Sequence, residues 1–296
     1  MKPVFFEFSL PLLGPVTFPA YMTMLLVGAT AAIIFARRHA ESVGIDGDHM
    51  FDLGILLLVS GIIGARLLAV LTDGHATDFV NLCLAPKKVA AVDAQVSYCT
   101  ASSQCGFDYV CDAARNVCYP PRDCLAALKF WWGGLTYYGG FMLAVPAGIW
   151  YSRRKQLDVL KVADVMAPAT MIGLFFGRIG CYYNGCCYGG HTDAFTGVRF
   201  PNRPGPVHPT QLYEGVVVAG LFAVLYFVVR PRKRNDGEVF AALLILYGLA
   251  RTLLEVFRAD PRGSLGPLST SQLISIPMVG VGMWMYARLR RNDNIL

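Results

Sequence analysis

The sequence predicts an all-α integral membrane protein with seven transmembrane helices. Hydrophobic residues make up 55% of the 296 residues and charged residues only 16%, whereas charged residues form nearer a quarter of an ordinary soluble domain. Several apolar stretches reach the length of about 20 residues that a helix needs to cross a bilayer. Helices are expected because the bilayer interior cannot satisfy open backbone groups. The predicted spans are roughly residues 15–36, 50–71, 131–151, 162–183, 212–230, 238–257 and 268–288.

Basic residues fix the expected orientation of these spans. Half of the 26 lysines and arginines fall in four clusters on alternate connections. By the positive-inside rule this side is cytoplasmic, so the N-terminus is expected to be periplasmic and the C-terminus cytoplasmic. The clusters are Arg37 and Arg38; Arg153, Arg154, Lys155 and Lys161; Arg230, Arg232, Lys233 and Arg234; and Arg288, Arg290 and Arg291.

The basic residues also bear on partners and on processing. The net charge of +6 does not indicate a nucleic-acid partner, because the clusters lie between apolar stretches and not on one polar face. The N-terminus lacks the features of a cleavable signal peptide, because only Lys2 forms its basic region and prolines interrupt the apolar residues after it. The first apolar segment is therefore expected to be retained as a span.

A cysteine-rich segment, residues 73–128, separates the second and third spans and interrupts what is otherwise expected to be a single membrane domain over residues 1–296. An even number of cysteines on an external loop predicts a disulfide framework on the periplasmic side, with 15 possible connectivities for six cysteines. A zinc site is less favoured because the segment has no C-x-x-C pair. Its role, as a lid or docking element or as a passive stapled loop, stays open. Its cysteines are Cys83, Cys99, Cys105, Cys111, Cys118 and Cys124.

Several arginines lie inside or at the ends of apolar stretches. An arginine at the bilayer centre costs about 2.5 to 3.5 kcal/mol on insertion scales, so its default interpretation is functional. Arg178 lies in IGLFFGRIG, and Arg251 can pair with Glu255 one helical turn later. Arg66 and Arg258 stand near span ends, where snorkelling toward the head groups is the alternative. Because guanidinium groups pair well with phosphate, we expect a binding site for an anionic phospholipid head group.

Two glycine-rich motifs accompany this site. WWGGLTYYGGF, residues 131–141, places two glycine pairs around Tyr138, which suggest a helix break or a close approach there. GRIGCYYNGCCYGG, residues 177–190, surrounds Asn184. Recurrent glycine predicts that the helix breaks within residues 177–190, and non-helical backbone at membrane depth is tolerated only beside protein or a water-filled cavity. For the three cysteines of this motif, the pattern favours small apolar packing over a reactive or metal-bound role. They are Cys181, Cys186 and Cys187.

The motif HPTQLYEG, residues 208–215, opens the fifth span. Pro209 and Thr210 are typical of a helix start. The polar side chains gathered there at one membrane edge are equally consistent with a binding site and with a structural role. They include His208, Gln211, Tyr213 and Glu214.

Five motifs together resemble the prolipoprotein diacylglyceryl transferase family. They occur in the family's order and cover nearly the whole chain except the insert. The resemblance implies a seven-span enzyme of the bacterial inner membrane. Such an enzyme transfers the diacylglyceryl group of phosphatidylglycerol to the thiol of the lipobox cysteine in a preprolipoprotein and releases glycerol phosphate. The motifs are LLGPVTFPAYMTMLLVG, GGLTYYGG, GRIGCYYNGCCYG, HPTQLYEG and YGLARTLLEVFR.

The resemblance also implies roles for individual residues. Arg178 and Arg251 match the family's essential arginines, which hold the lipid phosphate, and Tyr138 occupies the position of its catalytic base. No metal or organic cofactor is implied. Other positions sensitive in the family are matched by Tyr21, Asn184, Gly189, Glu214, Tyr247 and Glu255, and we expect Arg66, His208, Gln211 and Arg258 to complete the substrate-binding set.

Three residues depart from the family pattern. Tyr138 stands where the family usually has histidine, Cys181 where it often has asparagine, and Cys186 where it often has glutamate. A tyrosine with an ordinary pKa near 10 is a poor base at neutral pH. The alternative function is therefore a diverged homologue that binds anionic phospholipid without turnover. A transporter would require an inverted repeat, and the sequence has no convincing internal symmetry.

Overall fold

The chain is mostly helical, with helices at all seven predicted positions. The computed structural model describes residues 4–10, 14–72, 76–88, 110–112, 117–119, 122–125, 136–200, 204–258, 264–265 and 268–292. The long helices are α1 (Ala20–Glu41), α2 (Gly47–Thr72), α4 (Tyr137–Arg154), α5 (Val159–Asn184), α6 (Thr210–Ala223), α7 (Glu238–Leu254) and α8 (Thr270–Asn292). A π-helical turn η5 (Val224–Val229) and 3-10 turns η6 (Arg230–Arg232) and η7 (Glu255–Phe257) extend α6 and α7.

Five of these helices are long and apolar enough to cross a membrane: Ala20–Glu41, Gly47–Leu71, Val159–Asn184, Thr210–Arg232 and Glu238–Phe257. The prediction of a helical multi-pass membrane protein is therefore confirmed. Within the described residues, helices α4 and α8 do not meet the same criteria of length and apolarity. Residues 131–135, the start of the predicted third span, lie outside the described residues.

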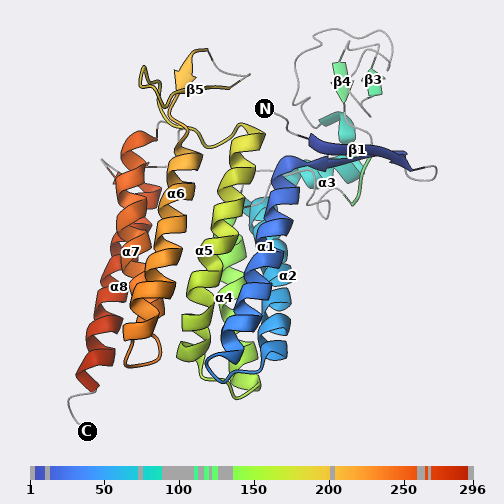
Figure 1. Ribbon diagram of the computed structural model, residues 1–296. Coiled ribbons are helices and arrows are strands. Elements are labelled where there is room, and N and C mark those ends of the chain that lie inside the picture. Colours follow the sequence, from blue (N-terminus) through green and yellow to red (C-terminus); the bar gives the residue numbers. More distant parts are fainter. Residues whose placement is uncertain are drawn as a thin grey trace. The chain divides into compact units, whose positions relative to one another are not determined.

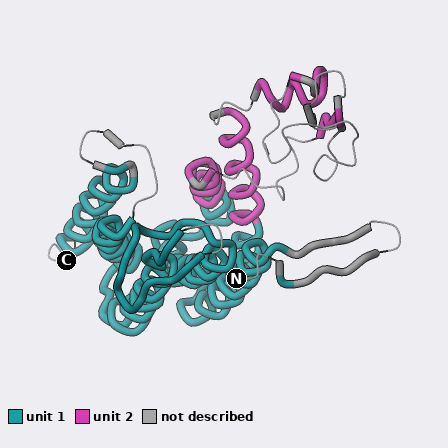
Figure 2. Tube along the Cα trace, turned by 90° about the horizontal axis from the view of Figure 1, so that it is seen from above, with its two compact units in different colours: residues 1–55, 151–296 teal, residues 56–150 magenta. Residues whose placement is uncertain are grey.

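The chain divides into two compact units, shown in different colours in Figure 2. Unit 1 comprises residues 1–55 and 151–296, and unit 2 comprises residues 56–150. In unit 1, α5 packs against α1, α6 and α7, and α8 packs against α7 (Figure 1). Buried aliphatic residues of α5, α6, η5 and α7 form its core, among them Met171, Val218, Leu225 and Leu243. Unit 1 carries most of the predicted site residues.

The first helix begins later than predicted. The sequence placed this span from about residue 15, but Gly14–Pro19 forms strand β2, which pairs antiparallel with β1 (Val4–Leu10). Pro19 occupies the N-cap in extended conformation, with φ −60° and ψ 135°. Proline suits a helix start because its missing N–H has no helical partner there.

The predicted helix break within residues 177–190 is confirmed, because α5 ends inside this motif. Helix α5 continues through Gly177 and Gly180 and ends at Asn184, where Gly185 caps it with φ 69°. Gly180 serves helix packing, because a Cβ there would lie 3.1 Å from Met24 Cβ and 3.3 Å from Tyr21 Cδ2 on α1. Irregular backbone therefore starts only at residue 185.

The four basic clusters lie at one end of unit 1. Side-chain contacts at this end join the ends of neighbouring helices. Arg230 Nη2 of η6 lies 2.7 Å from Ser42 Oγ after α1, and Lys233 Nζ after η6 lies 3.0 Å from Asp164 Oδ2 of α5. Arg290 Nη2 of α8 lies 3.4 Å from Glu238 Oε2 of α7. Their grouping at one end agrees with the predicted alternation of loops. Arg178, Arg251 and the start of α6 lie toward the other end of their helices.

The cysteine-rich segment contains at least part of the predicted disulfide framework. Cys83, in helix α3 (Ala76–Leu84), is disulfide-bonded to Cys124, 41 residues later. Cys111 is also disulfide-bonded and lies in strand β3 (Val110–Asp112), which pairs antiparallel with β4 (Val117–Tyr119). Cys99 and Cys105 lie outside the described residues. The boundaries 73–128 of the insert and its periplasmic location stay predictions.

Candidate functional site

A buried carboxylate connects charged side chains from three segments of unit 1. Glu214, the fifth residue of α6, has a side chain that is only 1% exposed. Its Oε1 lies 2.8 Å from Arg178 Nη2 of α5, and its Oε2 lies 3.8 Å from Arg258 Nη1. The Tyr247 hydroxyl of α7 donates to Oε1 at 3.3 Å. The structure thus brings together four residues that the sequence proposed separately.

Arg251 forms a second buried ion pair, on α7. Its Nη2 lies 3.0 Å from Glu255 Oε2, which confirms the predicted pairing of residues four apart. The same nitrogen donates to Ser271 Oγ of α8 at 2.9 Å. Tyr247 lies one turn earlier on the same helix and interacts electrostatically with Arg178. The two ion pairs therefore belong to one site, which we call the arginine site: Arg178, Glu214, Tyr247, Arg251, Glu255 and Arg258.

Two arginines of this site have a buried N–H group that makes no hydrogen bond within the described part of the chain. Arg178 Nε and Arg251 Nη1 are buried and find no hydrogen-bond acceptor among the residues that the structure describes. A buried donor without an acceptor costs about 1 to 3 kcal/mol, and more when it is charged. Because native structures contain few such groups, these two N–H groups are candidate donors to a ligand.

Backbone hydrogen bonds fix the loop segments around the arginine site. Gly189 N donates to His208 O at 2.8 Å, and His208 N donates to Gly190 O at 2.9 Å. Gly190 N donates to Phe257 O at 3.1 Å, and Gly189 forms a β-bridge with Arg258. This frame holds Arg258 beside Glu214. It also explains why glycine stands at position 189, since a Cβ there would contact Phe257 O and lie 2.7 Å from Thr210 Cγ2.

Gly189→Ala is expected to disturb both stability and activity. Overpacking of this kind costs about 1 to 3 kcal/mol, and relief of the clash would displace Arg258. We expect a lower melting temperature in detergent and reduced turnover. Gly220→Ala is the matched control, because a Cβ at Gly220 of α6 meets nothing within 4 Å in the described residues. Equal behaviour of the two variants would contradict the close-contact explanation.

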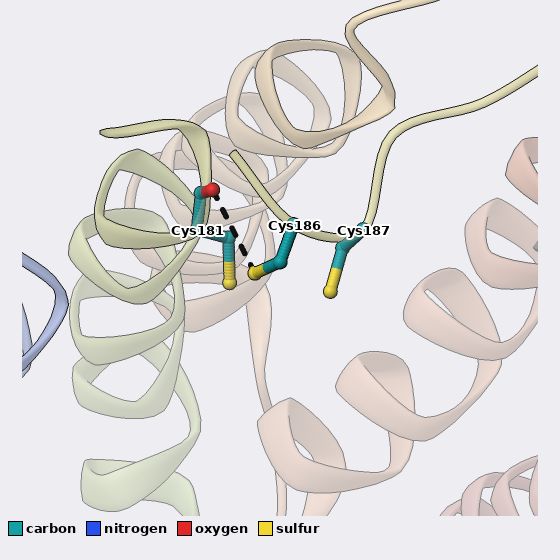
Figure 3. Close-up of side chains that lie close together, drawn as sticks. All are labelled: Cys181, Cys186 and Cys187. Carbon is teal, nitrogen blue, oxygen red and sulfur yellow. Dashed lines mark hydrogen bonds between the residues drawn. The ribbon is translucent and has the colours of Figure 1, made fainter. Parts of the chain in front are cut away.

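The turn after α5 brings three thiols together. The sulfur atoms of Cys181, Cys186 and Cys187 all lie within 4.8 Å of one another (Figure 3). Cys186 Sγ contacts Cys181 O at 3.7 Å. Hydrogen bonds from the Cys181 and Cys186 thiols, with the nearby charges of Arg258 and Arg178, lower the pKa of the Cys187 thiol below its usual range, although burial opposes this. The sequence favoured apolar packing for these residues and did not predict that they would meet.

Residues at the start of α6 hold this turn in place. Gln211 Nε2 donates to Cys186 O, and Thr210 Oγ1 donates to Cys187 O at 2.7 Å. Gln211, predicted to bind substrate, therefore contacts the backbone of the turn. The role of Thr210 was missed. Its position after Pro209 was the only signal in the sequence.

The remaining predicted residues of unit 1 lie around the arginine site. Tyr21 of α1 packs against Gly180 and interacts electrostatically with Arg178 and the three thiols. Asn184 ends α5 and is exposed. His208 lies in an aromatic cluster with Phe257 and Tyr213, and its Nδ1 lies 3.2 Å from the Tyr213 hydroxyl. The His208 ring thus contacts neighbouring aromatic rings at the edge of the arginine site.

Arg66 and Tyr138 belong to unit 2. The Arg66 guanidinium lies 5.2 Å from the ring centroid of Phe79 in α3. Tyr138 is the second residue of α4 and is 42% exposed. Close packing of α2 and α4 explains the glycines of this region, because a Cβ at Gly139 would contact Gly64 O and lie 2.5 Å from Leu68 Cβ. Of the two alternatives beside Tyr138, a helix break or a close approach, the structure shows the close approach, at Gly139.

Comparisons with known proteins agree on one family. A family model described as prolipoprotein diacylglyceryl transferase matches residues 8–288. A phosphatidylglycerol--prolipoprotein diacylglyceryl transferase of Geobacter sulfurreducens is 32% identical over 298 aligned positions, covering 98% of this chain and 96% of its own length. The protein of the same name from Clostridium tetani is 30% identical and covers 97% of both chains.

Proposed function

Since the chain belongs to the prolipoprotein diacylglyceryl transferase family, we propose that its arginine site binds the phosphate of phosphatidylglycerol during diacylglyceryl transfer. The chain is a multi-pass membrane transferase of lipoprotein maturation. In the proposed reaction, the thiol of a lipobox cysteine attacks the glyceryl carbon that bears the phosphate. The carbon–oxygen bond breaks, a thioether forms, and glycerol phosphate leaves.

The observation that carries this assignment is the pair of buried, unused donors on Arg178 and Arg251. Donors that are fixed before the reaction stabilise the charge that develops on a leaving group, without reorganisation. Arg178 is held by Glu214, and Arg251 is held by Glu255 and Ser271. The carboxylates therefore orient the guanidinium groups, and the remaining N–H groups donate hydrogen bonds to the phosphate oxygens.

We further propose seven spans in the bacterial inner membrane, with a periplasmic N-terminus and a cytoplasmic C-terminus. The grouped basic clusters support a cytoplasmic location for that end of unit 1. The arginine site then faces the periplasmic half of the bilayer. Attaching a reporter enzyme after residue 292 and after residue 200 should give opposite compartments, and equal compartments would contradict this topology.

The transfer reaction is tested with purified protein, phosphatidylglycerol vesicles and a synthetic peptide that contains one lipobox cysteine. Mass spectrometry should detect the diacylglyceryl thioether on the peptide, with an equimolar release of glycerol phosphate. A peptide with serine in place of the cysteine is the control. Absence of thioether from folded protein that still binds the vesicles would instead support the alternative of binding without turnover.

Tyr138→Phe tests the proposed role of the phenol as proton acceptor. A general base contributes about 10²- to 10⁴-fold to a rate, so we expect turnover to fall at least about tenfold when the hydroxyl is removed. Tyr137→Phe is the matched control on the neighbouring residue of α4. Unchanged turnover of Tyr138→Phe would remove this phenol from the proton transfer.

A further inference from the structure

The three thiols beside the arginine site have the composition and spacing of a metal site. Cys181 lies in the last turn of α5, and Cys186 and Cys187 lie in the turn after that helix; Figure 3 shows their thiol groups directed into one space. Their sulfur atoms lie within 4.8 Å of one another. Tetrahedral zinc with Zn–S bonds of about 2.3 Å separates its sulfurs by about 3.8 Å. Closing the cluster around one ion therefore requires shifts of roughly 1 Å or less.

The turn that carries these thiols is held in a specific conformation. Cys187 has φ 64°, in the left-handed region that non-glycine residues rarely adopt. Buried side chains of α6 fix it, because Thr210 donates to the carbonyl of Cys187 and Gln211 donates to the carbonyl of Cys186. A strained residue persists only where its surroundings over-determine it. Here the hydrogen bonds keep two adjacent thiols on the side of Cys181.

Apolar packing does not account for this arrangement. Cys187 interacts electrostatically with Arg178 and Arg258, so the cluster borders on charged groups. The three thiols are also free, whereas Cys83 and Cys124 of the same chain form a disulfide. On the proposed periplasmic side, neighbouring free thiols readily become disulfides unless they are bound. A bound soft metal ion would keep them reduced and would place their negative charge beside two guanidinium groups.

We propose that Cys181, Cys186 and Cys187 bind one zinc ion whose fourth position receives the thiol of the acceptor cysteine. Structural zinc sites have four protein ligands, whereas catalytic sites have three and an open position. In the described part of the chain, no fourth histidine, cysteine or carboxylate joins the three thiols. The proposed function places the lipid phosphate at the neighbouring arginine site, so a thiol bound to the zinc ion would be held near the phospholipid.

The role of the fourth position rests on the proposed function. The peptide thiol loses its proton to the proposed acceptor, Tyr138, as its sulfur binds the ion. The bound thiolate then attacks the glyceryl carbon, its electron pair forms the carbon–sulfur bond, and the carbon–oxygen bond breaks toward the phosphate. Zinc is neither oxidised nor reduced. Metal coordination deprotonates a thiol outright, which supplies a nucleophile independently of a histidine base.

Metal content is the first test. The full chain is purified under reducing conditions without chelator, and its metals are measured by inductively coupled plasma mass spectrometry. We expect about one zinc ion per chain. Cys181→Ser, Cys186→Ser and Cys187→Ser should each weaken zinc binding more than about 100-fold, because losing a ligand exceeds the 10- to 100-fold cost of losing a group that orients one. The double variant Cys83→Ser/Cys124→Ser should retain zinc, because it removes two cysteines outside the cluster.

Cobalt substitution tests the open position. Co²⁺ in the site should give the intense visible absorption of a four-coordinate thiolate complex, and these bands should shift when the lipobox peptide is added. The peptide with serine in place of cysteine should leave the bands unchanged. Both measurements are independent of turnover. Melting temperatures of the variants establish that each remains folded.

Several outcomes would overturn the inference. Zinc-free protein that also gives no cobalt bands after reduction would exclude the site. A disulfide among the three cysteines in protein isolated without reductant, or copper in place of zinc, would exclude the zinc assignment. Cobalt absorption bands that do not shift when the cysteine peptide is added would exclude the open position. If zinc is absent while thioether still forms, the metal site is excluded and the proposed function is retained. If zinc and the peptide bind but no thioether forms, the proposed function is excluded and the metal site is retained.

Discussion

Replacing Arg178 with alanine is expected to lower the turnover of diacylglyceryl transfer by about 10²- to 10³-fold, the loss typical of removing one donor that stabilises developing charge. The variant removes the buried Nε and the partner of Glu214 together. It is expected to remain folded, because Glu214 keeps Arg258 and Tyr247 as neighbours. The measurements are kcat and KM for phosphatidylglycerol, with the melting temperature in detergent.

Two further variants define what this loss means. Arg178→Lys retains a positive charge, but a lysine ammonium cannot bridge a carboxylate and a phosphate as a planar guanidinium does; we expect it to recover only a small part of the rate. Arg153→Ala changes an exposed arginine at the end of α4 and should leave turnover unaltered. Near wild-type turnover by folded Arg178→Ala would remove Arg178 from the site.

Glu214→Gln is expected to have the second-largest effect. The substitution keeps the size of the side chain but removes the negative charge between Arg178 and Arg258. Breaking a buried ion pair by removing one partner costs about 3 to 5 kcal/mol, so the melting temperature should fall. Turnover should fall about 100-fold, because a displacement of roughly 1 Å at a reacting group costs that much.

Glu238→Gln is the control that separates activity from stability. The Glu238 side chain is also 1% exposed and pairs with Arg290 at 3.4 Å, but it lies at the basic end of unit 1. It should lower the melting temperature without a comparable change in kcat. If Glu214→Gln and Glu238→Gln lower kcat equally, Glu214 acts only through stability and has no positioning role.

Some features of the site could be predicted from the sequence because they are local. Arg251 and Glu255 pair because residues four apart share one face of a helix. The start of α6 at Thr210 was predicted from Pro209, since proline suits the beginning of a helix. The end of the helix within residues 177–190 was predicted from its recurrent glycines, but not which glycine ends it. Glycine marks both a helix break and a close helix contact, and only the neighbouring helix α1 distinguishes them at Gly180.

The sequence by itself determined that the chain is a helical membrane protein, where its helices lie, and which arginines lie within or at the ends of its apolar segments. It could do so because the bilayer imposes length and apolarity on each span separately. Only the tertiary structure decided that Glu214 lies between Arg178 and Arg258 and that three cysteines share one space. The Glu214 contacts join segments far apart in the chain, and the turn that gathers the cysteines is held by Thr210 and Gln211 of α6. Which faces of α5, α6 and α7 meet depends on how all the helices pack, and no single segment encodes it.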